Sequence, residues 1–286
     1  MIPAAFDYVR AASLDEAVTL AGKPGHKLIA GGQSLLPLMK LRLARPETLV
    51  DIGRIDELHG VRELPDGRLA VGALTTYTEL MNSPASHYGV LRDAIPDIGD
   101  VQVRNRGTVG GSIAHCDPAS DLPACLLALD AELVFRSGRG ERTSACDGFF
   151  KGAFMTALEA DELITQVRLP APRDDAGSAY VSLSQPASGY SMVGVAAVVA
   201  RGGPGGPIAF SRIAITGVGE APYRARAVEE ALAGSDGSGD SIAAAAAHAT
   251  DGTQVNSDIH ANAAYRTAMA AVYTRRAIEA ALGRIA

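Results

Sequence analysis

Two glycine-containing stretches have the composition of anion-binding loops. Residues 28–40 read LIAGGQSLLPLMK and residues 104–124 read RNRGTVGGSIAHCDPASDLPA. Tight turns can direct several neighbouring backbone N–H groups at one anion, and glycine permits both the turn and the close approach of a ligand. The hydroxyls of Ser34, Thr108 and Ser112 add further donors. Together the loops could clamp a pyrophosphate from two sides, although either one alone is as typical of an ordinary turn between a strand and a helix.

Motifs for other phosphate sites and for hydrolysis are absent from the sequence. There is no G-x-x-x-x-G-K-[ST] P-loop and no G-x-G-x-x-G fingerprint, because GVGEAP at residues 217–222 lacks the last glycine. No G-x-S-x-G motif is present, and His115 and Asp117 have no third ligand at metal-binding spacing. The sequence therefore predicts neither catalytic residues nor a metal site, and a dinucleotide would need another binding geometry.

Two further residues have more than one interpretation. Asp121 follows Ser120 at the start of a helical pattern, so its carboxylate could accept hydrogen bonds from a ribose or could cap the helix. The pattern alone favours the cap. Tyr190 lies in ASGYSMVG, where an aromatic ring could pack in a core or cover a planar ligand, and the pattern does not choose between them.

The first loop lies in a strand–helix–strand pattern. Residues 27–30 read as a strand, residues 34–43 have the apolar spacing of a helix with Pro37 in its first turn, and residues 48–52 read as a second strand. A capping box at residues 13–16 begins an earlier helix. This order predicts a βαβ-like unit, with the glycine loop where a strand meets a helix.

The rest of the chain alternates between short strands and helices and ends in a helical cluster. Residues 171–179 read as a linker. The sequence therefore divides into a βαβ-like first subdomain at residues 1–55, a second subdomain at 56–170, and a C-terminal domain with a small antiparallel sheet plus helices at 177–286. Strands are predicted at residues 68–73, 161–170, 190–200 and 207–219, a hairpin around 138–140, and helices at 75–81, 121–130, 224–234, 241–250 and 261–282.

Composition and charge restrict the class of protein. The 286 residues are 47% apolar and 20% charged, which is typical of a globular chain, and the net charge of −6 argues against nucleic acid as a partner. No apolar run reaches the ~20 residues of a membrane-spanning helix, and the N-terminus lacks a signal-peptide pattern. Three cysteines without a close-spaced pair favour a reducing cytoplasm over a disulfide framework or a cysteine-held metal cluster.

Three stretches together resemble a known family. Residues 30–46, 104–133 and 257–282 look like the corresponding parts of the FAD-binding medium subunits of molybdenum hydroxylases, the family of carbon monoxide dehydrogenase and xanthine dehydrogenase. The resemblance runs through nearly the whole chain in the same order. It implies an α+β fold, in which a two-subdomain FAD-binding fold of the vanillyl-alcohol-oxidase-like (PCMH) type precedes a small C-terminal sheet-and-helix domain.

The resemblance also implies an FAD site. Residues 30–34 and 108–112 would wrap the pyrophosphate, and Asp121 would hold the adenosine side, which reverses the preference of the pattern alone. Ile164 and Tyr190 would lie against the flavin ring. The implied cofactor-binding residues are Leu28, Ile29, Ala30, Gly31, Gly32, Gln33, Ser34, Leu35, Thr108, Val109, Gly110, Gly111, Ser112, Asp121, Ile164 and Tyr190.

One segment departs from the family pattern. Family members often carry basic residues in the strand before Tyr190, whereas residues 181–189 read VSLSQPASG, with no Lys or Arg. A flavin contact from a basic side chain is therefore missing here, or it is replaced by Ser182 or Ser184.

The implied function is an electron relay in an oxidoreductase complex. A large subunit oxidises substrate at a molybdenum cofactor, a small subunit carries iron–sulfur clusters, and the FAD of this chain passes the electrons to an external acceptor. A dimer of such heterotrimers is one assembly that the resemblance allows. Two alternatives remain open from the sequence: a self-contained FAD-dependent oxidase and a non-catalytic nucleotide-binding module.

Overall fold

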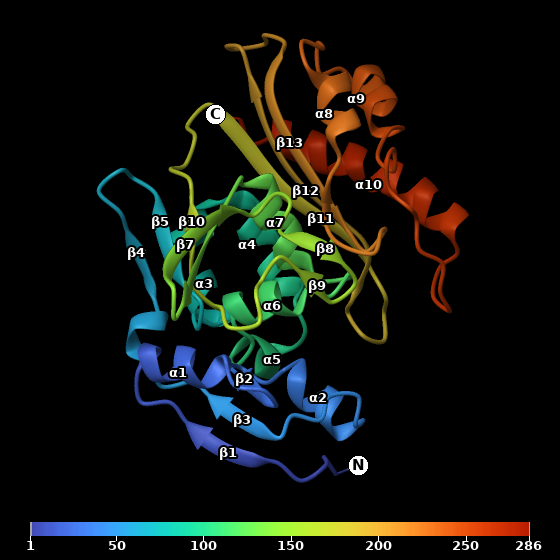
Figure 1. Cartoon of the computed structure of the whole chain (residues 1–286). Coiled ribbons are helices and arrows are strands. Elements are labelled where there is room, and N and C mark those ends of the chain that lie inside the picture. Colours follow the sequence, from blue (N-terminus) through green and yellow to red (C-terminus); the bar gives the residue numbers. More distant parts are fainter. Residues whose placement is uncertain (1, 286) are drawn as a thin grey trace.

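The N-terminal segment forms a small parallel sheet accompanied by short helices. The structure, a computed structural model, describes residues 2–285. The elements are β1 (Asp7–Arg10), α1 (Leu14–Ala21), β2 (His26–Ile29), α2 (Leu35–Lys40) and β3 (Thr48–Asp51). The strands pair in parallel in the order β1-β3-β2 and occupy one end of the molecule (Figure 1). The succession β2–α2–β3 confirms the predicted βαβ-like unit.

Helix α2 is shorter than the sequence predicts. The predicted helix extends to Leu43, but α2 ends at Lys40 and Arg42 adopts a positive φ of 60°. The N–H of Leu43 donates to the carbonyl of Leu38 at 2.9 Å, so the chain turns before the apolar run is complete. This turn leaves the side chain of Leu43 exposed.

The middle of the chain is an antiparallel sheet covered on one face by helices. The sheet has the order β4-β5-β10-β6-β7. Several predicted elements of this region are confirmed: strands β5 and β10, the β6–β7 hairpin, and helices α3 and α7. The bounds are β4 Val61–Glu63, β5 Leu69–Gly72, α3 Tyr77–Met81, α4 Gly89–Ala94, α5 Val101–Arg104, α6 Val109–His115, α7 Asp121–Ala128, β6 Glu132–Ser137, β7 Gly140–Ala145, β8 Phe150–Gly152, β9 Met155–Thr156 and β10 Leu163–Leu169, with 3-10 turns η1 Asp56–Leu58, η2 Pro84–His87 and η3 Ile95–Asp97.

The C-terminal part is an antiparallel sheet followed by helices. The sheet order is β11-β12-β13-β14. Two of its strands, β12 and β13, and the three helices confirm predicted elements. The bounds are β11 Ala176–Ser184, β12 Ser191–Arg201, β13 Ile208–Thr216, β14 Tyr223–Arg224, α8 Arg226–Leu232, α9 Gly239–Ala246 and α10 Ala263–Leu282.

The prediction of a linker at residues 171–179 is wrong for its second half. Strand β11 begins at Ala176 and pairs with β12 through nine residues. A methyl group on Gly177 would place its carbon 1.8 Å from the carbonyl oxygen of Ala281, so a small residue lets α10 pack directly on the strand. The small residues that resemble a linker therefore serve a close strand–helix contact.

The C-terminal sheet is buried on both faces. One face carries Val193, Val195 and Ala197, which pack with residues of α8, α9 and α10. The other contributes Ala196 and Val198 to the core beneath α4, α6 and α7. In Figure 1 this sheet lies between the green helices of the middle region and the red helix α10. The largest core is therefore shared by the middle region and the C-terminal sheet.

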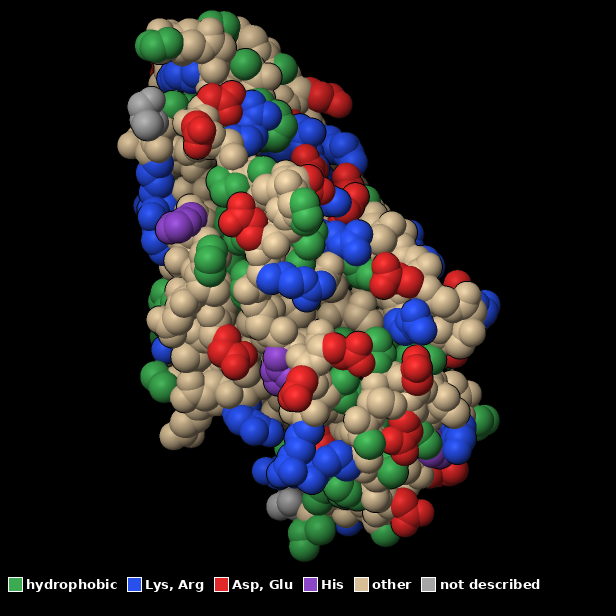
Figure 2. All heavy atoms as spheres, turned by 90° about the vertical axis from the view of Figure 1, so that its left-hand side faces the viewer, with side chains coloured by type: hydrophobic (Ala, Val, Ile, Leu, Met, Phe, Trp, Pro, Cys, Tyr) green, Lys and Arg blue, Asp and Glu red, His purple; other side chains and the backbone are tan. Residues whose placement is uncertain are grey.

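Charged side chains of both signs are interspersed over the surface shown in Figure 2, with basic ones in its upper and its lower parts. The negative net charge is thus not concentrated in one acidic patch on this face. None of the helices within residues 2–285 is both long enough and apolar enough to cross a membrane.

Candidate functional site

The two glycine-containing segments lie in direct contact. Gly31 follows β2, and a methyl group there would place its carbon 1.8 Å from the backbone oxygen of Arg106, near the start of the second segment. Only glycine allows the backbones to approach this closely. The next residue, Gly32, has a φ of +75°, which favours glycine for a second reason. The fold therefore brings together the two segments that the sequence singled out.

The first segment presents a row of unused backbone donors. Within the described chain, the N–H groups of residues 31–35 donate no hydrogen bond to any other residue. The carbonyl of Gly32 accepts from the N–H of Leu36 at 3.0 Å, which starts α2 directly after the row. Consecutive unbonded N–H groups on a turn suit the oxygens of a phosphate. This segment fits a pyrophosphate.

The second segment is more ordered than the sequence predicts. Thr108 is the N-cap of α6, so Val109–Ser112 form the first turn of a helix. Its N–H groups are already bonded: Val109 to Thr75 O at 3.0 Å and Gly110 to Ala73 O at 2.8 Å. The expectation of a tight glycine turn here is wrong. The two glycines lie in the first turn of a helix, where their small size allows close packing.

The two glycines of this helix have different surroundings. A methyl group on Gly110 would place its carbon 2.6 Å from Cβ of Ala73, so this glycine is required by packing. The same group on Gly111 would meet only the hydroxyl oxygen of Thr108, at 2.7 Å. That hydroxyl accepts the Gly111 N–H at 3.2 Å. The side of α6 at Gly111 is therefore open.

Asp121 does not cap α7. The N-cap is Ser120, and Asp121 is the first helical residue. Its Oδ1 accepts hydrogen bonds from the Tyr180 hydroxyl and, at 2.5 Å, from the Ser191 hydroxyl. The residue is only 6% exposed, and burial raises the pKa of its carboxyl to about 6 against the opposing effect of the two hydrogen bonds. This carboxylate is held by specific partners, which the capping interpretation does not explain.

Tyr180 and Ser191 are partners of Asp121 that the sequence does not single out. They come from β11 and β12, and their contacts with Asp121 span 59 and 70 residues of chain. Gly194 is the nearest local signal, because a methyl carbon there would lie 2.0 Å from the Tyr180 hydroxyl oxygen. Without the fold, that glycine cannot be connected with Asp121.

Other polar side chains lie between Asp121 and the second glycine segment. The hydroxyl oxygens of Ser112 and Ser120 are 2.9 Å apart, which joins α6 to the start of α7. Burial raises the pKa of the nearby Tyr77 to about 12, and the charge of Asp121 and the proximity of Tyr190 act in the same direction. The second segment, Asp121 and Tyr190 therefore share one region of the molecule.

Tyr190 is presented by a structured hairpin. Its side chain is 53% exposed, and burial of the remainder raises its pKa, as do Asp117 and Asp121. The Gln185 N–H donates to Tyr190 O at 2.8 Å. The Gln185 side-chain oxygen accepts from the N–H of Ser188 at 2.6 Å. A half-exposed aromatic ring on a closed hairpin can cover a planar ligand.

The remaining predicted residues lie in or near the core. Ile164 is buried on the inner face of β10, at a register shift between Ile164 and Gln166. Leu28 packs against a smaller core beside β2. In the segment without basic residues, the hydroxyl oxygens of Ser182 and Ser184 are 3.2 Å apart. These serines therefore bond to each other at the place where a basic residue was expected.

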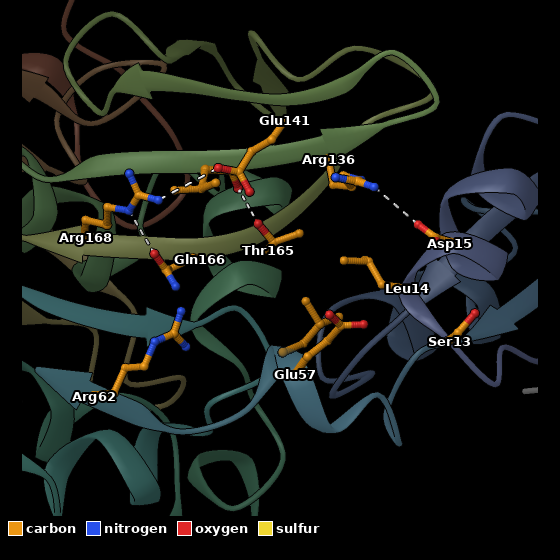
Figure 3. A pocket seen from close by; sticks show the side chains of 12 residues that line it. Ser13, Leu14, Asp15, Glu57, Arg62, Arg136, Glu141, Thr165, Gln166 and Arg168 are labelled. Carbon is orange, nitrogen blue, oxygen red and sulfur yellow. Dashed lines mark hydrogen bonds and ion pairs between the residues drawn. The ribbon is translucent and has the colours of Figure 1, made fainter. Parts of the chain in front are cut away.

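A cavity of about 380 Å³ is lined by Thr165 (Figure 3), whereas the preceding residue of β10, Ile164, belongs to the core. Because successive side chains of a strand point to opposite faces of a sheet, the cavity lies on the opposite face of the middle sheet from Ile164. Arg136 is 3.4 Å from Asp15 across it, and Arg168 donates to the side chain of Gln166 at 2.9 Å. None of the predicted cofactor-binding residues lines this cavity. The residues that do are Ser13, Leu14, Asp15, Glu57, Leu58, Arg62, Val134, Arg136, Glu141, Thr165, Gln166 and Arg168.

Comparison with known families defines the class of protein. Residues 4–172 match the FAD binding domain in molybdopterin dehydrogenase, and residues 178–281 match the CO dehydrogenase flavoprotein C-terminal domain. A chain that carries these two domains in this order is a flavoprotein of the molybdopterin dehydrogenases.

Individual relatives agree over the full length. The carbon monoxide dehydrogenase medium chain of Hydrogenophaga pseudoflava is 40% identical, with 100% of both chains covered. The glyceraldehyde dehydrogenase medium chain of Sulfolobus acidocaldarius is 36% identical over 98% of this chain and 99% of the relative. A solved structure of the Hydrogenophaga pseudoflava carbon monoxide dehydrogenase, lacking the Mo-pyranopterin moiety, contains a chain that superposes with a TM-score of 0.95 at 42% identity, again with 100% of both chains covered.

The protein therefore belongs to the family of FAD-binding medium subunits of molybdenum hydroxylases. The resemblance drawn from the sequence, the α+β fold class and FAD as the cofactor are confirmed.

Proposed function

We propose that this chain is the electron-transfer subunit of a molybdenum hydroxylase complex. Its partners are a large subunit with the molybdenum cofactor, where substrate is oxidised, and a small subunit with iron–sulfur clusters. The observation that carries the proposal is the contact between two glycine segments beside a row of unbonded N–H groups, within a domain of an FAD-binding family.

The residues around the glycine segments have distinct roles in this proposal. Residues 30–34 hold the pyrophosphate through backbone N–H groups, and α6 forms the adjoining wall on which Gly111 leaves room. Asp121 accepts hydrogen bonds from the ribose on the adenosine side. Tyr190 covers the flavin ring, and Ile164 supports it from the core. FAD held here would supply the redox chemistry, since a flavin can take up electrons singly and release two together, and the role of these residues would be to bind and orient it.

The domain division that we propose consists of two FAD-binding subdomains and a C-terminal domain. Residues 1–55 and 56–170 are the FAD-binding subdomains, with the glycine segments where they meet, and residues 177–286 are the C-terminal domain. The family matches at residues 4–172 and 178–281 support the second boundary. The contact of Gly31 with Arg106 supports a site between the first two.

We place the complex in the cytoplasm. Within the described chain, Cys116, Cys125 and Cys146 are free and buried. Burial raises the pKa of the Cys116 thiol to about 11, so these cysteines are inert thiols of a kind that a reducing compartment maintains. Fractionation of cells that produce the protein tests this placement.

Spectroscopy of the full chain, purified without its partners, tests the proposal. We expect a flavin spectrum, release of free FAD on denaturation, bleaching by a chemical reductant, and recovery with an artificial acceptor. Substrate of the complex should leave the spectrum unchanged unless the partner subunits are added. Turnover by the chain alone would instead make it a self-contained oxidase, and failure to bind FAD would make it another kind of module.

A further inference from the structure

The carboxylate of Asp121 is held by hydroxyl groups from the other domain. Asp121 begins α7 within the part that matches the FAD-binding family, whereas Tyr180 and Ser191 lie on strands of the C-terminal sheet. Both hydroxyls donate to the same oxygen, Oδ1. The other oxygen, Oδ2, accepts no hydrogen bond from any other residue in the described chain, so it remains available to a ligand hydroxyl.

The Tyr180 hydroxyl has little freedom to leave this position. The backbone N–H of Tyr180 donates to a carboxylate oxygen of Asp93 at 3.1 Å, which fixes the start of the side chain. The far end of the ring lies where a side chain on Gly194 would be, 2.0 Å from the site of a methyl carbon. The Ser191 hydroxyl oxygen is 3.3 Å from that of Tyr180. The three groups form one buried, hydrogen-bonded cluster.

We propose that Tyr180 and Ser191 are positioning residues that orient the Asp121 carboxylate towards the ribose of FAD. This inference rests on the role proposed above for Asp121. A ribose hydroxyl donates to a carboxylate, and such a charge-assisted bond is stronger than a neutral one. An oriented, ionised carboxylate therefore binds FAD more tightly than a rotating or protonated one.

The surroundings of Asp121 make its charge sensitive to these two donors. Burial raises the pKa of the carboxyl to about 6, and the hydrogen bonds from Ser191 and Tyr180 oppose that effect. The charge of Asp97 raises the pKa further, while burial raises the pKa of Tyr77 and Cys125 and keeps both neutral near pH 6. The other titratable groups that face this cluster are Asp93, Asp97, Tyr77, Cys125 and Tyr190.

A pH dependence of FAD binding follows from this arrangement. The ionised fraction of the carboxyl falls about tenfold for each pH unit below its pKa, and the apparent affinity for FAD falls with it. Removing one donor raises that pKa, by about one unit for a hydrogen bond to a charged group, and moves the midpoint of the fall to higher pH. A merely structural contact between the domains would leave the midpoint unchanged.

The test is the dissociation constant of FAD for the full apo chain, measured between pH 5 and pH 8. Tyr180→Phe and Ser191→Ala should each bind FAD about threefold more weakly than the wild type near pH 6.5 and about tenfold more weakly near pH 5, with the midpoint shifted upward by about one unit. The matched control is Tyr223→Phe. It removes a buried hydroxyl from the same domain, one that donates to Ala249 O at 2.9 Å, and should leave the pH profile of FAD binding unchanged.

Variants that are less stable but keep the wild-type midpoint would overturn the inference. Ser191→Ala removes a single oxygen, so it provides the same test if Tyr180→Phe does not fold. Asp121→Asn distinguishes a wrong positioning role for Tyr180 and Ser191 from a wrong assignment of Asp121 to FAD binding. If Asp121→Asn binds FAD as the wild type does, the assignment of Asp121 to the cofactor is wrong, whereas weakened binding with unshifted profiles in the other variants contradicts only the positioning role.

Discussion

Gly110 and Gly111 are neighbours in α6, yet the structure predicts opposite consequences for their replacement by alanine. A methyl group on Gly110 would overlap Ala73, and overpacking of this kind costs about 1–3 kcal/mol of folding free energy. At Gly111 a methyl group displaces only the Thr108 hydroxyl. There, a loss of about 1 kcal/mol from the cap offsets a gain of about 1 kcal/mol from helix propensity.

We therefore expect Gly110→Ala to lower the unfolding midpoint of the apo chain, and Gly111→Ala to keep it while weakening FAD binding by tenfold or so, since an interaction of about 1.4 kcal/mol corresponds to tenfold. Thermal unfolding and FAD titration of both variants measure the two effects. Gly138→Ala is the control, because a methyl group there meets nothing within 4 Å. Normal FAD affinity in Gly111→Ala would remove this helix face from the site.

Asp121 should make the apo chain less stable as the pH rises. Burial raises its folded-state pKa to about 6, above the value of about 3.9 in an unfolded chain. The folded state therefore binds more protons between these values, and its stability falls as the pH rises from about 4 to above 6. Asp121→Asn should remove this dependence. Denaturant unfolding of the apo wild type and of Asp121→Asn at pH 5 and pH 8 checks the sign. If the free energy of unfolding changed between the two pH values by the same amount in both proteins, the prediction would be contradicted.

The sequence identifies site residues that are needed for the local backbone conformation. It misses residues whose contact partners are distant in the chain. The glycine pair at Gly31 stands out because glycine is favoured at a turn. Asp121 stands out because it lies at the start of a helix, but the sequence pattern alone favours a capping role for it. Tyr180 and Ser191 carry no local signal, since only the fold brings β11 and β12 to the start of α7.

At the level of elements, strand β10 separates two environments. Ile164 faces the core, and Thr165 faces the cavity of about 380 Å³ that Arg62 and Arg168 also line. Because the cavity is on the other face of the sheet, Arg62→Ala and Arg168→Ala should leave the dissociation constant of FAD within about twofold of the wild type, the change expected from a surface substitution. Titration of the folded variants checks this. A tenfold loss would place part of the cofactor on that face.

Elements with clear hydrophobic spacing were predictable, and glycine-rich ones were not. The pattern of residues 48–52 predicts β3, and residues 261–282 predict α10, because each buries a regular apolar face. The first turn of α6 and the start of β11 read as loops because they are rich in Gly, Ser and Ala. In both, the small residues allow close packing against a distant segment, as with Gly177 beside Ala281.

At the scale of the whole molecule, the two family domains share one core. Ala196, Val198 and Ala214 of the C-terminal sheet belong to the core that also contains residues of α4 and α7. Asp130, after α7, pairs with Arg212 at 2.6 Å and with Arg224 at 2.7 Å, both in the C-terminal domain. Neither domain can separate without exposing apolar surface, and burial of such surface is the main stabilising contribution to folding.

We therefore expect the chain to unfold in one cooperative transition that FAD shifts as a whole. At a free FAD concentration 100 times the dissociation constant, the stabilisation is about 2.7 kcal/mol. For a chain of this size, that raises the unfolding midpoint by roughly 5 °C. Asp130→Asn should lower the midpoint without splitting the transition, because it removes ion pairs but not the shared core. The exposed pair with Arg212 contributes only about 0–1 kcal/mol. The buried Arg224 keeps its ion pair with Glu229 at 2.7 Å, so the fall should be a few degrees at most.

Hydrogen exchange distinguishes one cooperative unit from two. The slowest amides of α10, in the C-terminal domain, should gain protection on FAD addition to the same extent as those of α6 beside the proposed site, because global unfolding limits the exchange of both. Two thermal transitions, or FAD protection confined to residues 4–172, would show that the domains unfold separately despite the shared core. The hydrogen bonds of Tyr180 and Ser191 to Asp121 would then be too weak to couple cofactor binding to the C-terminal domain.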